Sequence, residues 1–189
     1  VANVAPSSGH EGTLVTITGT GLRGNGTRVS EVRLNDLIAT LLSESDTRVV
    51  VSAAFGAAAG VGDVVLEADT GALVTSTNGW RYVPTAVITS VLPSSGQRGT
   101  RVTVIGTDLL AGASELAQVQ LGGANATLVS ANNTRVVFAA GDADPALLVS
   151  LRFVMNTGAV VTEESAFTYL TRGVIDSISP NVASAGARV

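Results

Sequence analysis

Apolar and polar residues alternate with a period of two along most of the chain. The runs at 14–18 and 102–105 consist largely of Val, Ile and Thr, which favour the pleated, half-buried surface of a β-strand. Gly, Asn, Asp, Ser and Pro cluster between such runs, at 6–12, 19–28, 43–46, 56–63 and 69–72. Turn signals at this spacing are typical of a β-sandwich. The pattern therefore predicts an all-β chain.

The same pattern occurs twice, 87 residues apart. Placing residues 4–83 on 91–170 gives 30 identities in 80 positions without a gap. In the first copy we expect strands near 1–5, 13–19, 29–34, 37–42, 47–53, 63–68 and 73–83, and in the second copy the same set shifted by 87. Similarity at a fixed period indicates an array of like structural units.

A third copy begins near the end of the chain, where VIDSISPNVASAGARV (174–189) aligns with VITSVLPSSGQRGTRV (87–102). We therefore expect one sandwich at 1–84, a second at 85–171, and the first strand of a third repeat at 172–189. That strand would continue along the same chain or complete a neighbouring subunit. We further expect the chain to be a segment of a longer protein.

Composition narrows the functional class. Hydrophobic residues make up 46% of the chain and charged residues 14%, too apolar for a disordered tail. Apolar runs are short and interrupted, so the sequence predicts no membrane-inserted segment. The net charge is −4, and all eleven cations are Arg, so no basic tract favours nucleic acid as a partner. The absence of cysteine excludes disulfides and thiolate chemistry.

Candidate catalytic and cofactor motifs are weak. His10 is the single histidine, lies in an expected turn and is replaced by Gln97 in the second copy, so we expect neither a Ser-His-Asp triad nor a His-ligated metal site. GTGLRG at 19–24 matches G-x-G-x-x-G, but we expect a strand rather than a helix to follow it. Asp142 and Asp144 could contribute to a calcium site, although an ordinary solvated loop is favoured. We expect no enzymatic activity and no cofactor.

The repeat opening resembles the IPT/TIG domain, an Ig-like fold found in plexins and Rel-type transcription factors. It carries the pattern P-x-x-G-x-x-G-T-x-V-T-I-x-G-T-x-L. The matching positions are Pro6, Gly9, Gly12, Thr13, Val15, Ile17, Gly19 and Leu22, then Pro93, Gly96, Gly99, Thr100, Val102, Val104, Gly106 and Leu109. The family usually has Phe where Leu22 and Leu109 stand. The resemblance implies tandem Ig-like β-sandwiches arranged end to end.

Each copy closes on an aromatic pair, Trp80 with Tyr82 and Phe167 with Tyr169, which fits the aromatic last strand of that family. We expect one ring of each pair to fill the core and the other to cover an edge or the next domain.

Three N-x-Ser/Thr sequons are candidate glycosylation sites, at Asn25, Asn125 and Asn132. Asn25 lies in a Gly-rich loop and Asn132 in a polar turn, so we expect these two to be modified in preference to Asn125. The expected number of chance sequons is about two, so placement rather than number supports them.

These observations favour a non-catalytic structural or adhesive segment of a long extracellular or cell-surface tandem-repeat protein that forms a rod or filament. Its expected partners are neighbouring copies of the same repeat, with glycans as additional candidates. The alternative is an accessory or ligand-binding module of a larger receptor or secreted polysaccharide-acting enzyme. A Rel-like DNA-binding role is disfavoured by the acidic charge and the absence of lysine.

Overall fold

The computed structural model describes residues 1–55 and 59–179. Over these residues the chain forms strands and no helix, which confirms the all-β expectation. Unit 1 comprises β1 (Asn3–Ala5), β2 (Ser8–Gly9), β3 (Leu14–Thr18), β4 (Val29–Leu34), β5 (Leu37–Ile38), β6 (Thr40–Glu44), β7 (Arg48–Ser52), β8 (Gly60–Ala68) and β9 (Leu73–Tyr82). Unit 2 comprises β10 (Val87–Leu92), β11 (Ser95–Gly96), β12 (Arg101–Thr107), β13 (Leu116–Leu121), β14 (Ala124–Ala131), β15 (Arg135–Ala139), β16 (Ala146–Met155) and β17 (Val160–Tyr169).

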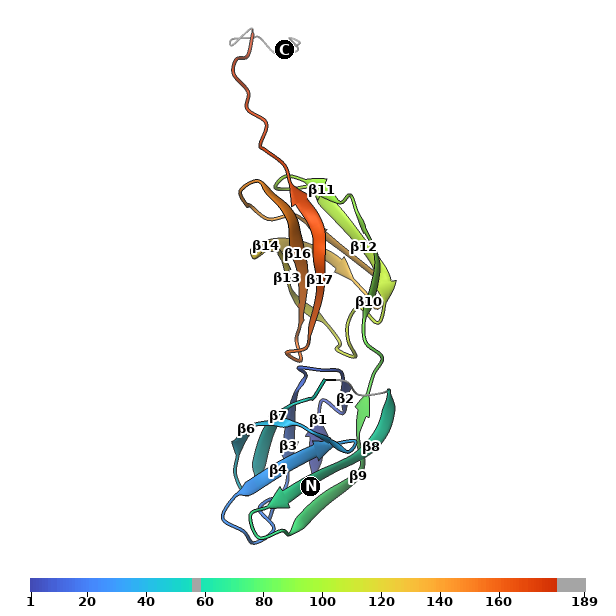
Figure 1. The fold of residues 1–189 in the computed structure, drawn as a ribbon, viewed down its shortest axis with the longest axis vertical. Helices are drawn as coiled ribbons and strands as arrows, with labels where there is room; N and C mark the ends of the chain where they lie inside the picture. The colour runs from blue at the N-terminus through green and yellow to red at the C-terminus, as the bar shows by residue number, and fades with distance from the viewer. Residues whose placement is uncertain (56–58, 180–189) are drawn as a thin grey trace, which may run out of the picture.

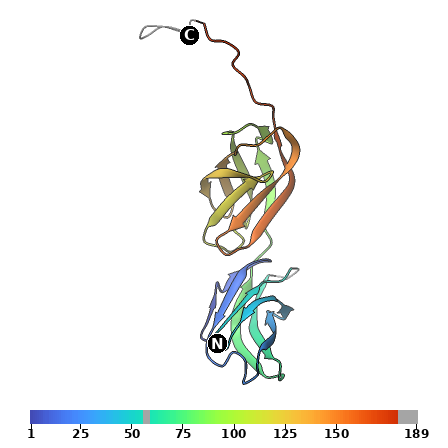
Figure 2. The same cartoon turned by 90° about the vertical axis from the view of Figure 1, so that its left-hand side faces the viewer.

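Unit 1 has two sheets, with strand orders β1-β3-β7-β6 and β2-β9-β8-β4-β5. Unit 2 has the same pairings, but β14 contacts both β15 and β13 and so joins the two layers into one sheet. In unit 1 the equivalent stretch is divided at Ala39 into β5 and β6. Figures 1 and 2 show the two units following one another along the long axis of the molecule, connected by residues 83–86.

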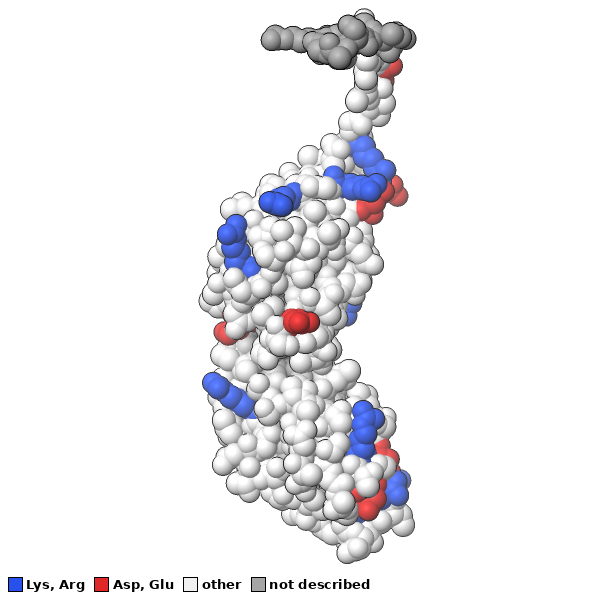
Figure 3. All heavy atoms as spheres, turned by 180° about the vertical axis from the view of Figure 1, so that it is seen from behind, with Lys and Arg blue, Asp and Glu red and all other residues white. Residues whose placement is uncertain are grey.

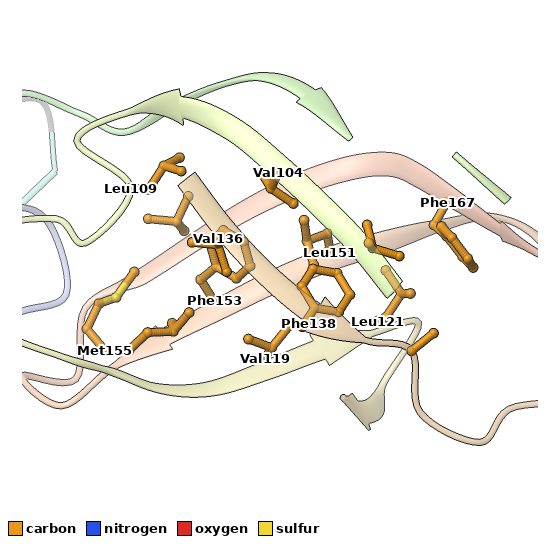
Figure 4. Packing of buried hydrophobic residues seen from close by; sticks show 14 of the residues in the cluster. Val104, Leu109, Val119, Leu121, Val136, Phe138, Leu151, Phe153, Met155 and Phe167 are labelled. Atoms are coloured by element: carbon orange, nitrogen blue, oxygen red, sulfur yellow. The ribbon is translucent and has the colours of Figure 1, made fainter. Parts of the chain in front are cut away.

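Each unit has its own hydrophobic core, built from alternate residues of facing strands. In unit 1 the core contains Ile17, Val51, Leu66 and Trp80, all fully buried. In unit 2 Phe138 and Phe153 stand where unit 1 has Val51 and Leu66. Figure 4 shows Phe138 and Phe153 within this core and Phe167 farther along it. The greater volume of Phe138 and Phe153 in unit 2 compensates for the smaller ring of Phe167, which stands at the position of Trp80.

The expectation for the aromatic pairs was wrong, because both rings of each pair are buried. Trp80 and Tyr82 are exposed by 0% and 1%, and Phe167 and Tyr169 by 1% and 3%. Residues two apart in a strand point to the same face. The rings therefore pack edge to face inside one core, with centroids 5.6 Å apart in unit 1 and 5.2 Å apart in unit 2.

No helix long and apolar enough to cross a membrane occurs in the described part of the chain. Residues 172–179 form no strand and are exposed, and Figure 1 shows this segment leading away from unit 2. Of the span 172–189 predicted to hold the first strand of a third repeat, residues 172–179 form no strand in the structure, and 180–189 lie outside the described residues.

Candidate functional site

The contact between the two units is the candidate functional site. Its first component is a turn of unit 2, residues 156–159 between β16 and β17, here called the inner turn. It lies against residues 10–14 of unit 1, here called the inner seat. This segment leads into β3 and ends at its first residue, Leu14. The backbone N–H of Leu14 donates to the carbonyl oxygen of Thr157 at 2.8 Å. This hydrogen bond links the main chains of two units that are otherwise joined by a short connection.

Two glycines of unit 2 allow the units to approach closely. Gly158 has φ +85°, and a Cβ added there would lie 2.8 Å from Cγ of Leu14. Gly112 has φ +78°, and a Cβ there would lie 3.1 Å from Val83 and 3.4 Å from the Cα of Gly9. Both positions therefore combine a left-handed backbone with a contact that a side chain would disturb.

Burial differs between the inner seat and its counterpart in unit 2. His10 and Thr13 are buried, with 7% and 0% exposure, whereas the equivalent Gln97 and Thr100 are half-buried. The backbone of the two segments is alike, since Thr13 N–H donates to the His10 carbonyl and Thr100 N–H to the Gln97 carbonyl. We attribute the additional burial of the inner seat to the unit that rests on it.

His10 is a titratable group at this contact. Its Nδ1 lies 2.8 Å from the Glu11 carbonyl oxygen, so Nδ1 carries the donated proton, while the buried Nε2 has no hydrogen-bond partner among the described residues. Burial lowers the pKa of His10 below its ordinary 6.5, although the Glu11 carbonyl and the Glu11 charge act in the opposite direction. The ring is therefore neutral near pH 7.

A cavity of about 420 Å³ opens beside this contact. Both units line it, unit 1 with His10, Glu11, Phe55 and others, and unit 2 with Val160, Val161 and Thr162. Phe55 is 79% exposed. Burial raises the pKa of Tyr82, another lining residue, whose hydroxyl oxygen accepts a hydrogen bond from the Ala54 N–H at 3.2 Å. The cavity is thus lined by apolar and polar side chains in similar measure.

The three sequon asparagines are exposed and lie in different surroundings. Asn25 is in a turn with φ 64°. Asn125 lies in β14, where its side-chain oxygen accepts a hydrogen bond from Gln118 at 2.7 Å. The Asn132 side-chain oxygen accepts from the backbone N–H groups of Thr134 and Arg135 at 2.9 and 2.8 Å, which fixes the turn before β15.

The remaining candidate motifs support no catalytic centre. Strand β4, not a helix, follows the glycines of 19–24, so the motif lacks the helix N-terminus that binds a pyrophosphate. Asp142 is paired with Arg98 and Arg172, and Figure 3 shows a group of basic and acidic side chains at the end of unit 2 near the departing tail. The described residues contain no group of three or more His, Asp or Glu able to hold a metal.

Sequence reasoning did not identify the residues that form the contact between units, namely Leu14, Thr157 and Gly158. The hydrogen bond uses backbone groups that every non-proline residue carries. The one available signal is the TGA sequence at 70–72 and 157–159, a turn that both repeats retain.

Comparisons with known proteins identify the fold. Residues 86–169 match the model of the IPT/TIG domain family. The full extracellular region of plexin A4 is similar in structure, with a TM-score of 0.62 and 20% identity over 95% of this chain and 16% of that one. A second plexin A4 structure gives a TM-score of 0.55 and 18% identity over 89% of this chain and 18% of that one. The chain thus spans about a sixth of the plexin chain, and at these identities the likeness concerns the fold alone.

Another solved structure is less similar to this chain. A Bacteroides ovatus surface protein, SGBP-B of a mixed-linkage glucan utilization locus, has a TM-score of 0.37 and 14% identity over 88% of this chain and 43% of that one. No curated protein sequence matches the chain.

Proposed function

Residues 86–169 match the model of the IPT/TIG domain family, and from this premise we propose that the chain is a non-catalytic structural or adhesive segment of a long extracellular or cell-surface tandem-repeat protein that forms a rod. Residues 1–84 and 85–171 are its two complete sandwiches, and 172–189 opens a third. Neighbouring copies of the repeat are its partners.

The main-chain hydrogen bond from Leu14 to Thr157, 2.8 Å long, carries this proposal. Together with the close approach of Gly112 to Val83, it supports a fixed angle between consecutive units. A fixed angle, repeated at a constant 87-residue period, generates a linear array. Without such contacts, adjacent domains on a short connection would be expected to move relative to one another.

A distance measurement between spin labels tests the fixed angle. The chain has no cysteine, so a label can be attached at S30C in unit 1 and at A117C in unit 2, both exposed positions. We expect a narrow distribution of distances, as narrow as that of a control pair, A117C and E164C, inside unit 2. A broad distribution for the first pair alone would show that the units move independently and would contradict the rod.

The cellular location is tested separately on the organism that makes the protein. Antibodies raised against the folded chain should label intact, unpermeabilised cells or secreted material. Labelling that appears only after permeabilisation would contradict an extracellular or cell-surface location.

The cavity between the units favours a second candidate function, an accessory or ligand-binding module. Phe55 exposes 79% of its surface beside Thr85 and Thr162, and an exposed ring next to hydroxyl groups suits the apolar face and hydroxyls of a sugar. A panel of oligosaccharides titrated against the labelled protein by NMR tests this. Binding should be lost in F55A and retained in L147A, an exposed apolar control. Absence of any binding would remove this candidate.

A further inference from the structure

The cavity between the two units adjoins a second one. The first, of about 420 Å³, and the second, of about 370 Å³, share Glu11, Val160 and Thr162 among their lining residues. Together they are here called the junction groove. Glu11 and Gly12 of unit 1 lie on one side of it, and Val160 and Thr162 in β17 of unit 2 lie on the other. An extended ligand in this groove therefore contacts both units.

Glu11 is the single charged group among the described residues that line the junction groove. His10, which also lines it, is neutral near pH 7 because burial lowers its pKa. Glu11 is exposed and forms no salt bridge with another described residue. The groove therefore presents one negative charge that no cation of the described chain neutralises.

The equivalent positions of unit 2 carry charges that pair with one another. Glu11 corresponds to Arg98, and Phe55 corresponds to Asp142. Arg98 and Asp142 form a salt bridge at 3.8 Å, and Arg172 also pairs with Asp142. Where unit 2 has this ion pair, unit 1 has a carboxylate and an exposed aromatic ring. The combination is thus a property of the junction between the units and not of the repeat in general.

The ring and the carboxylate attract the same kind of chemical group. Phe55 is 79% exposed and lines the same cavity as Glu11. A cation is attracted both by an aromatic face and by a carboxylate. Thr85 and Thr162 line this cavity with exposed side chains, whose hydroxyl groups can donate to and accept from the hydroxyls of a sugar.

We propose that the junction groove binds an oligosaccharide that carries a protonated amine, with the amine beside Glu11 and a sugar face on Phe55. This inference rests on the second candidate function above and names the ligand class for that cavity. A neutral sugar uses the ring and the hydroxyls alone. A sulfated or carboxylated sugar brings a like charge toward Glu11, which selects against it.

A matched series of 1,4-linked tetramers tests the amine. Their sugar units differ at carbon 2, which carries an amine in glucosamine, an acetamide in N-acetylglucosamine and a hydroxyl in glucose. In NMR titrations at pH 7 and low salt, the glucosamine tetramer should bind at least about threefold more tightly than the other two. Equal affinities would overturn this inference and leave the sugar-binding candidate standing. Binding of none of the three would also overturn it, whereas the candidate function itself falls only if the wider oligosaccharide panel fails as well.

The variant E11Q tests the position of the amine. It should lower the affinity for the glucosamine tetramer to that of the acetylated tetramer and leave the affinity for the glucose tetramer unchanged. E115Q is the matched control, because Glu115 is exposed beside a separate cavity of about 300 Å³ that unit 2 lines alone. An unchanged affinity in E11Q, or an equal loss in E115Q, would overturn the assignment of the amine to Glu11.

The second repeat supplies a variant that should remove the site. E11R/F55D places the residues of Arg98 and Asp142 at the equivalent positions of unit 1. Both replaced side chains are exposed, so we expect the fold to be retained. Binding of all three tetramers should be lost, because the ring is absent and the remaining carboxylate faces an arginine. Retained binding would show that the sugar binds elsewhere.

Two further titrations separate the contributions of the amine and the sugar. Added sodium chloride should reduce the affinity for the glucosamine tetramer toward that for the glucose tetramer, because salt screens exposed charges. An advantage of the amine that does not depend on salt would contradict its pairing with Glu11. The amide of Nα-acetyl-lysine carries a protonated amine without a sugar, and we expect it to bind more weakly than the glucosamine tetramer. Equal binding would show that the groove recognises an amine alone and would overturn the oligosaccharide.

Discussion

The backbone N–H of Leu14 donates to the carbonyl oxygen of Thr157 across the boundary between two sandwiches, at 2.8 Å. A hydrogen bond between backbone groups does not depend on which side chains the two residues carry. Repeats whose side chains have diverged can therefore keep this contact, provided that the turn retains its glycine. The relationship explains how two units with different surface residues can meet in one defined way.

The variants G158A and G71A distinguish the strain of the turn from the contact between units. Both glycines have positive φ, +85° and +82°, so each substitution should cost its own unit about 1 kcal/mol of unfolding free energy. Only G158A also brings a Cβ within 2.8 Å of Leu14 Cγ. We expect the spin-label distance distribution between the units to broaden in G158A and to remain narrow in G71A. Equal distributions would show that Gly158 is a turn residue and no part of the contact.

Replacing Trp80 or Phe167 with Ala should destabilise the unit that contains it. Both side chains are fully or almost fully buried, at 0% and 1% exposure, so removal of the ring leaves a cavity and costs about 3–5 kcal/mol. Urea unfolding followed by NMR signals of each unit measures the loss. F55A is the control, because Phe55 is 79% exposed and its removal should leave the stability unchanged. A small loss in W80A would contradict the core position of this ring.

Most of the strands were predictable because a period of two is a local property of the sequence. The predicted strand at 29–34 has the bounds of β4 (Val29–Leu34), and the 87-residue period transfers each assignment to the second copy. The two-residue strands β2 and β11, which pair in parallel with β9 and β17, are too short to show any period. Their pairing follows from tertiary structure.

The contact between units was not predictable from one sequence. Leu14 of the contact corresponds to Arg101 in the second repeat, and Asn156, before the threonine of the turn, corresponds to Asp69 in the first. The side chains at these positions therefore share no pattern that would predict the contact. Its donor and acceptor are backbone atoms, which the sequence does not distinguish. The burial of the single histidine, His10, was likewise not predictable, because it arises only in the folded chain.

Expression in a eukaryotic secretory host should add N-linked glycan to Asn25 and Asn132 in preference to Asn125. All three are exposed, and a surface with 14% charged residues gains solubility from attached sugars. Intact-mass analysis of the wild type and of N25Q, N125Q and N132Q measures occupancy at each site. A wild-type mass equal to that of the polypeptide would contradict the prediction, and modification of Asn125 alone would reverse the predicted preference.

The contact between units should weaken as the pH falls. His10 is 7% exposed beneath unit 2, and its pKa is lowered from 6.5 by burial. The separated state, in which this side chain is more exposed, therefore binds the proton more readily than the docked state. Well above pH 6.5 the ring is neutral in both states and pH has no effect. As the pH falls below this value toward the lowered pKa, protonation favours separation.

The variant H10Q removes this titration while keeping a residue that the fold already accepts, because Gln97 occupies the same position in unit 2. We expect the spin-label distances between units to broaden from pH 7 to pH 5 in the wild type and to stay constant in H10Q. Glu11 is the other charged group beside the ring, and its negative charge raises the pKa of His10, so E11Q, which keeps the histidine, should retain a pH-dependent contact that H10Q lacks. Identical pH profiles in the wild type and H10Q would show that His10 does not control the contact.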